Sequence, residues 1–202
     1  YYGAANAVLV VAGDVEAEDV KARVEKYFGH IPSGPPLVKP DVNVARRTDD
    51  SRMVIQDRVP QDRVYKVWNV AAFKDPDVEY LDIASDVLTN GKSSRLYKRL
   101  VYDDRIATDV VSFSFTRQFG GMFIVWATAT AGKGLAEPEA GLNEEIARFI
   151  EEGPTQQELE RSQANQRATF IRGVERVGGF GGKSDVLAAS EVYLGSPDGH
   201  VE

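Results

Sequence analysis

The chain has 202 residues, a formal net charge of −7 and no cysteine, with 43% hydrophobic and 27% charged residues. This balance is ordinary for one globular domain with a real core, and its acidity argues against non-specific nucleic-acid binding, which needs a basic footprint. No apolar run approaches the ~20 residues of a membrane span, and the missing cysteines exclude disulfides, thiolate nucleophiles, Fe–S clusters and cysteine-ligated zinc.

The first fifty residues predict a strand, a helix and an extended connector. Residues 7–12 are six consecutive apolar residues, which favours a strand buried on both faces. After the turn at Gly13-Asp14, apolar residues at helical spacing predict a helix that ends at Gly29. Residues 30–50 contain four prolines and predict an extended connector between two parts of one domain.

Two strand pairs are predicted in the middle of the chain. Residues 52–56 and 64–70 are expected to form a hairpin or near-hairpin around a proline. Residues 106–115 and 122–130 are rich in β-branched and aromatic side chains and form the clearest pair, joined by a short glycine-containing turn.

Helices are predicted between and after these strands. Asp75-Pro76 indicates a helix start, because a capping carboxylate is followed by proline at the first helical position. A helix through residues 142–150 is followed by a capping box, Thr155 with Glu158, that opens a long polar helix. The order β-α, connector, β-β-α-α-β-β-α-α-α predicts an α+β fold, with one mostly antiparallel (mixed) sheet and helices packed on one face.

Residues 90–100 lie between two predicted helices and are unusually basic for an acidic chain. Asn90-Gly91 is free to take the left-handed turn that ends one helix, and Ser93 or Ser94 can cap the next. The face opposite the apolar stripe of that second helix is basic and consists of Arg95, Lys98 and Arg99, with Lys92 just ahead. This basic face is either a binding surface or a solvated helix face.

No catalytic or metal-binding motif can be assembled from the chain. Residues 91–93 and 182–184 resemble the end of a phosphate-binding loop, but both lack the glycine required five residues earlier. Neither His-Glu-x-x-His nor its inverse occurs, and the two histidines, His30 and His200, are far apart. No Gly-x-Ser-x-Gly turn presents a serine. The glycine-rich residues 178–182 predict a flexible joint between helices, with close approach to a ligand as the alternative.

Four segments, in this order, resemble the pitrilysin/insulinase family of zinc metallopeptidases, which includes the mitochondrial processing peptidases: residues 6–15, 29–32, 91–97 and 153–160. The resemblance covers nearly the whole chain and points to the second domain of a family half, without the zinc-binding motif. It implies the α+β fold of the processing peptidases. It also implies that zinc is held by the preceding domain of the parent chain, and that this chain holds no cofactor.

The resemblance further implies a parent zinc metalloendopeptidase whose two halves enclose the substrate in a chamber. This chain would be a non-catalytic domain that packs on the zinc-bearing domain and forms part of the chamber wall. Many second-half domains carry an Arg and a Tyr that reach the substrate, but the matching positions here hold Val101 and Thr108. The alternative is a scaffold domain of a catalytically dead relative, like the core subunits of the bc1 complex. By resemblance alone, the setting is the bacterial periplasm or cell envelope.

We therefore expect residues 1–202 to form a single α+β domain cut from a longer peptidase chain, inactive by itself and without catalytic or metal-binding residues. Its expected partners are the zinc-binding domain and the second half of the parent and a peptide substrate, without nucleic acid or a membrane span. A homodimer is a further option for the isolated piece. The residues expected to contact substrate or partner are Asn90, Gly91, Lys92, Ser93, Arg95 and Arg99.

Overall fold

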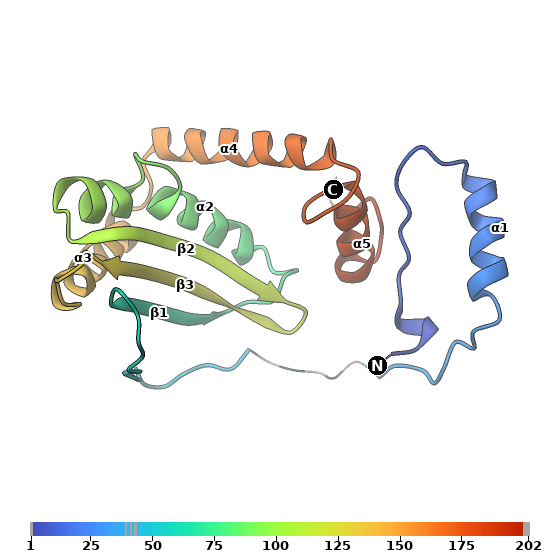
Figure 1. Ribbon diagram of the computed structural model, residues 1–202, viewed down its shortest axis with the longest axis horizontal. Coiled ribbons are helices and arrows are strands. Elements are labelled where there is room, and N and C mark those ends of the chain that lie inside the picture. The colour runs from blue at the N-terminus through green and yellow to red at the C-terminus, as the bar shows by residue number, and fades with distance from the viewer. Residues whose placement is uncertain (1, 39, 41, 43, 200–202) are drawn as a thin grey trace. The chain divides into compact units, whose positions relative to one another are not determined.

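The computed structural model describes residues 2–38, 40, 42 and 44–199 (Figure 1). The chain divides into two compact units, a larger one of residues 43–165 and a smaller one of residues 1–42 with 166–202. The expectation of a single domain over the whole chain stays a prediction. Among the described residues, none of the helices has the length and apolar character needed to cross a membrane.

A three-stranded antiparallel sheet forms the centre of the larger unit. Its strands are, in spatial order, β1 (Arg63–Val70), β3 (Gly120–Ala129) and β2 (Ala107–Arg117). The register pairs Val67 with Ile124 and Ile124 with Phe113, so β-branched and aromatic side chains meet across the strands. The predicted antiparallel pairing of β2 with β3 is confirmed.

The turn between β2 and β3 depends on close backbone approach. Gly121 pairs with Thr116 in the sheet. A Cβ atom on Gly121 would lie 2.8 Å from the Cα of Thr116 and 2.9 Å from the carbonyl oxygen of Phe115. Glycine is therefore required here for steric reasons.

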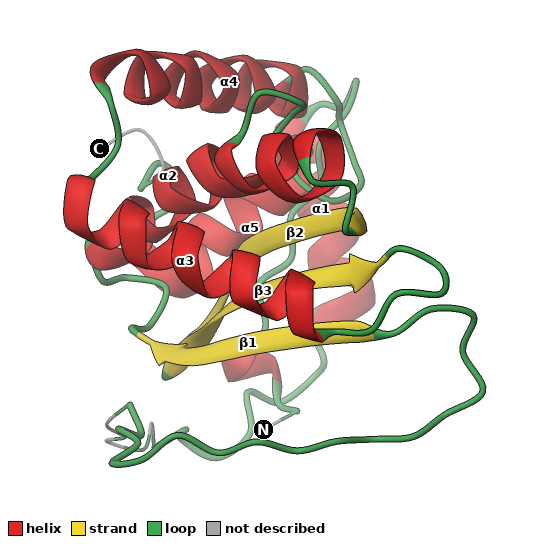
Figure 2. Cartoon of the chain, turned by 90° about the vertical axis from the view of Figure 1, so that its left-hand side faces the viewer, coloured by secondary structure: helices red, strands yellow, loops and turns green. Residues whose placement is uncertain are grey.

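Helices cover one face of this sheet, as Figure 2 shows. They are α2 (Asp77–Thr89), the π-helical η2 (Tyr97–Asp103) and α3 (Ala136–Glu152). Leu96, Leu100 and Leu142 are fully buried and pack with Val110 and Val125 of the sheet in one hydrophobic cluster. The predicted α+β architecture, with helices on one face, is confirmed.

Two predicted helix starts of the larger unit, at Asp75 and at Thr155, are also confirmed. The amide of Asp77 donates to the Oδ1 of Asp75 at 3.0 Å, which opens α2 as expected for a capping carboxylate. The amide of Thr155 donates to the Oε2 of Glu158 at 2.8 Å, and the amide of Glu158 donates to the Oγ1 of Thr155 at 3.3 Å. This reciprocal capping box opens α4 (Gln156–Val174).

The smaller unit is mainly helical. It contains η1 (Ala4–Asn6), α1 (Ala17–Phe28), the last residues of α4, and α5 (Lys183–Leu194). The amide of Gly29 donates to the carbonyl oxygen of Glu25 at 2.9 Å, so α1 ends at the predicted residue. His30 follows directly, whereas His200 falls outside the described residues.

Two predicted strands are not formed. Residues 7–12 carry no strand pairing, and most of their apolar side chains are exposed, with Leu9 at 59%. Residues 52–56 likewise form no hairpin with β1, and Met53 and Ile55 are about 80% exposed. A high β propensity means that a side chain fits well on a pleated, half-buried surface. A strand forms only where a neighbouring strand supplies the backbone hydrogen bonds, and these two segments have no such neighbour. The expected connector, residues 30–50, is without helix or strand wherever it is described; positions 39, 41 and 43 lie outside the described residues.

Candidate functional site

The loop that joins α2 to the next helix is exposed and tightly folded. Gly91 has φ +82°, and a Cβ there would meet open space, so the predicted left-handed turn is confirmed at this residue. The Nδ2 of Asn90 donates to the Oδ1 of Asp86 at 3.0 Å. Buried Ser94 donates its hydroxyl to the carbonyl oxygen of Gly91 at 2.6 Å, so it closes the turn and does not cap the helix as expected. All four residues from Asn90 to Ser93 are exposed.

The N-terminal half of α4 holds this loop in place through two side chains. The Nη1 of Arg161 donates to the Oγ of Ser93 at 3.0 Å. The hydroxyl of Ser162 donates to the Oδ2 of Asp86 at 3.0 Å, and Asp86 in turn accepts from the loop. The loop therefore has a defined position relative to α4, which reduces the entropy lost when a partner binds it.

Arg95 is a structural anchor. Its side chain is only 11% exposed and makes a two-point contact with Glu158, at 2.8 Å from Nε and 2.7 Å from Nη2. Nη2 also donates to the carbonyl oxygen of Gly153 at 2.9 Å, and the guanidinium lies 5.2 Å from the ring centre of Phe149. The hydrogen bonds from Arg95, with those from the Thr155 capping box, lower the pKa of Glu158 to about 2.

Arg99 also forms ion pairs, but its side chain is more exposed to solvent than that of Arg95. Its side chain is 30% exposed and bonds Glu144, while Asp104 lies 3.7 Å away and Glu145 3.6 Å away. Glu145 is fully buried on α3 and also bonds Arg148. The predicted basic face is thus neutralised by acids of α3 and α4 at Arg95 and Arg99.

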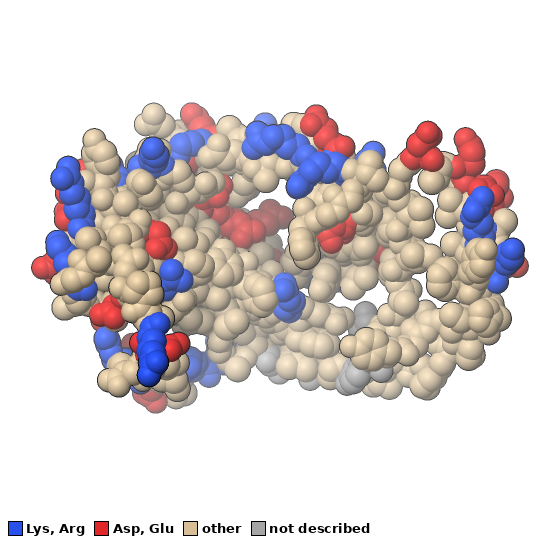
Figure 3. Space-filling model, in the orientation of Figure 1, with Lys and Arg blue, Asp and Glu red and all other residues tan. Residues whose placement is uncertain are grey.

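These pairs surround an open pocket of about 480 Å³, lined by four basic side chains, three acidic side chains and Ser93. Figure 3 shows both charge signs mixed over the visible face of the larger unit. Sequence reasoning found the basic run and the capping box separately. It missed that Glu158 and Arg161 hold residues 90–95, because no local pattern connects residues about 60 positions apart.

No metal centre is formed within the part of the chain that the structure describes, where no three His, Cys, Asp or Glu side chains gather to hold an ion. The expected contact residues fall into two groups. The first, the exposed loop Asn90 to Ser93, can meet a partner directly. The second group, Arg95 and Arg99, is less exposed and is engaged in ion pairs with acids of the same chain.

Residues 1–166 match the model of the peptidase M16 inactive domain. The chain belongs to this family. It is 31% identical, over 96% of its own length and 43% of the relative's, to zinc protease PqqE of Helicobacter pylori. A solved protease from Helicobacter pylori has 28% identity and a TM-score of 0.71, covering 94% of this M16 inactive domain and 46% of that chain. The chain thus spans less than half the length of these relatives.

More distant structures share the fold alone. The M16 inactive domain of Pseudomonas fluorescens has 18% identity and a TM-score of 0.67, over 92% of this chain and 43% of that one. The periplasmic protease PqqL of Escherichia coli has 17% identity and a TM-score of 0.60, over 94% and 21%. A chain of complex III2 from Candida albicans has 12% identity and a TM-score of 0.57, over 69% and 34%.

Proposed function

We propose that this chain is the non-catalytic domain of a parent zinc peptidase, packing on the zinc-bearing domain and forming part of the wall around a peptide substrate. Zinc would be held in the preceding domain of the parent. Membership of the inactive-domain family and the similarity to a zinc protease more than twice as long support this role. The name of the periplasmic neighbour supports a bacterial envelope setting.

Within this role, the contact surface is the loop Asn90 to Ser93. The observation that carries the assignment is that these four residues are exposed, while α4 fixes the loop through Arg161 and Ser162. Lys92 provides a cation on the loop for which no hydrogen bond or ion pair is found among the described residues. Arg95 and Arg99 do not belong to this exposed surface. Their ion pairs with Glu158 and Glu144 hold the helical segment after the loop against α4 and α3.

The test uses the parent peptidase with Lys92→Glu. We expect kcat/KM on peptide substrates, or association of the two halves, to fall about 3–10-fold at low salt, with the loss shrinking as salt rises, because exposed charges mainly steer association. Lys74→Glu, a second exposed lysine of the same unit, is the matched control. If the two variants lose the same amount of activity or association, the loop is not part of the contact surface.

The second candidate is a scaffold domain in a parent without activity. The fold similarity to a chain of complex III2 supports this second candidate, because that chain comes from an assembly not named as a protease. The parent's own sequence distinguishes the two: a His-x-x-Glu-His motif upstream supports the peptidase, since zinc needs both imidazoles and the acid, and its absence supports the scaffold.

A further inference from the structure

Arg161 on α4 carries a positive charge with which no acid of the described residues forms an ion pair. Its Nη1 donates to the Oγ of Ser93 at 3.0 Å, and its Nη2 is buried without a hydrogen-bond partner in the described part of the chain. Arg95 and Arg99, by contrast, each pair with a carboxylate. A buried donor left unsatisfied costs free energy, and the cost is larger when the donor is charged. Negative charge brought close to Arg161 would therefore be stabilised.

The acids near Arg161 in the chain are engaged elsewhere. The Oδ1 of Asp86 accepts from the Nδ2 of Asn90 and its Oδ2 accepts from the hydroxyl of Ser162, each at 3.0 Å. Glu160, the neighbour of Arg161 on α4, is exposed and accepts from a side chain of its own helix at 3.0 Å. Neither carboxylate meets the guanidinium of Arg161, so its charge is available to an external anion.

The hydroxyl of Ser93 is set up as a donor. A serine hydroxyl has one hydrogen to donate, and the oxygen of Ser93 already accepts from Arg161. Ser93 is exposed, and no acceptor for its hydrogen is found within the described part of the chain. A carboxylate oxygen that accepts this hydrogen would lie within ~6 Å of Nη1, because such bonds are ~2.7 Å long. At that range an opposite charge still favours the bound anion.

Lys92 adds a second cation to the same loop. It is exposed, and no ion pair of its ammonium group is found among the described residues. Glu158 is paired with Arg95, so the remaining charges at the loop are those of Lys92 and Arg161 against Asp86. The loop therefore has an excess of positive charge in a chain of net −7.

We propose that Ser93, Lys92 and Arg161 form a binding site for a carboxylate carried by a peptide segment, as the side chain of an aspartate or glutamate. Ser93 donates its hydroxyl to the carboxylate, and the ammonium group of Lys92 pairs with it. Arg161 is a positioning residue: it occupies the oxygen of Ser93, which leaves the hydrogen for the ligand, and it supplies charge. The inference rests on the proposed function in placing the loop at the contact surface, and it names the chemistry that the loop recognises.

The first test needs only the 202-residue chain. The probes are acetyl-Glu-Glu-amide and acetyl-Gln-Gln-amide, which have the same length and differ in charge. The measurement is the NMR shift of the backbone amides of Gly91 and Lys92 as each peptide is added at constant ionic strength. The glutamate peptide should give a saturable shift with a Kd in the millimolar range, and the glutamine peptide should not. Equal responses, or none, would overturn the proposal.

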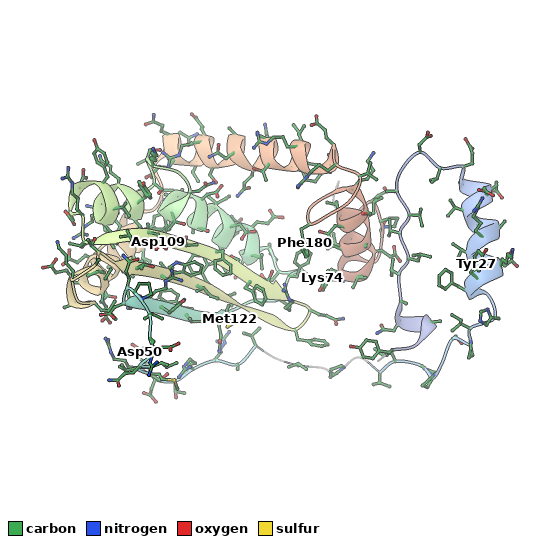
Figure 4. The ribbon with its side chains drawn as sticks, viewed as in Figure 1. Tyr27, Asp50, Lys74, Asp109, Met122 and Phe180 are labelled. Atoms are coloured by element: carbon green, nitrogen blue, oxygen red, sulfur yellow. The ribbon has the colours of Figure 1, made fainter. Side chains whose placement is uncertain are left out.

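Variants separate the site from general attraction. Ser93→Ala and Arg161→Gln should weaken binding of the glutamate peptide about 3–10-fold. Arg161→Lys, which keeps the charge, should retain most of it. Lys74→Gln is the control, because Figure 4 labels Lys74 before the start of α2, whereas the loop follows the end of that helix. If Arg161→Gln weakens binding no more than Lys74→Gln, or if Arg161→Lys loses as much as Arg161→Gln, the role given to Arg161 is wrong.

The parent peptidase distinguishes the two sources of the carboxylate. If the substrate supplies it, the glutamate peptide should bind the parent as it binds the isolated chain and should compete with substrate. If another part of the parent supplies it, the parent should exclude the peptide that the isolated chain binds.

The two proposals can fail separately. Binding of the glutamate peptide by the isolated chain, with no effect of Lys92→Glu in the parent, would refute the contact surface and leave the carboxylate site standing. An effect of Lys92→Glu without peptide binding would refute the carboxylate site alone.

Discussion

Glu158→Gln should destabilise the larger unit by removing the charge that holds Arg95. Glutamine keeps the shape of the side chain and can still accept from the amide of Thr155, so the capping box survives. The variant instead leaves the Arg95 guanidinium, 11% exposed, with the carbonyl oxygen of Gly153 and a carboxylate oxygen of Glu152 4.0 Å away. The substitution therefore removes the ion pair and keeps the helix cap, so its effect on stability reports the ion pair alone.

The expected loss in the free energy of unfolding follows from the pKa of Glu158. A fall from 4.5 to about 2 corresponds to ~3 kcal/mol at neutral pH, since each pKa unit is ~1.4 kcal/mol. Glu158 is 16% exposed, and solvent together with the remaining acceptors reduces this to about 2 kcal/mol. For a chain of this size the midpoint of thermal unfolding should fall by roughly 4–8 °C.

The pH dependence has a fixed sign. Because the pKa of Glu158 is lower in the folded state, its stabilisation is fully present above pH 4.5 and is lost as pH falls from about 4.5 to about 2. The gap between the wild-type chain and Glu158→Gln should therefore close in that window.

The assay is urea unfolding at several pH values, with Glu160→Gln as control. Glu160 is exposed on the same helix, and its one bond found within the described part of the chain is from Gln156, at 3.0 Å. The loss on its substitution should therefore stay below ~0.5 kcal/mol. If both variants lose the same small amount at pH 7, Arg95 and Glu158 do not form a stabilising pair. A gap that persists unchanged at pH 2 would contradict the pKa argument.

Three other outcomes are expected. Leu100→Ala, at a fully buried position of the core, should cost about 2–5 kcal/mol in urea unfolding, whereas Tyr102→Ala, 72% exposed, should cost less than ~0.5 kcal/mol. Gly121→Ala should lower the unfolding midpoint by several degrees through its clash with Thr116, while Gly134→Ala, where a Cβ meets open space, should not; equal shifts would refute the steric reading. Metal analysis of the purified 202-residue chain should find no stoichiometric zinc, and about one tightly held ion per chain would contradict the assignment of zinc to the preceding domain.

Much of the fold could be predicted because its signals are local. Asp75-Pro76 opens α2 and the Thr155–Glu158 box opens α4, since a cap acts on amides two or three residues away. The pairing of β2 with β3 follows from two β-rich runs joined by a short turn. Family membership was likewise predicted from four short segments, all of which lie within the matched residues 1–166.

The tertiary structure decided what lies between distant residues. Residues 7–12 and 52–56 have the composition of strands, but composition cannot supply the neighbouring backbone that a strand needs. The basic run after Gly91 suggested an open binding face, yet Arg95 meets Glu158 across 63 positions of sequence. A charge is free or compensated according to what the folded chain brings within ~4 Å of it. The sequence by itself thus determined most of the helices, the pairing of β2 with β3 and the family. Only the packing of α3 and α4 decided which side chains of residues 90–99 remain available to a partner.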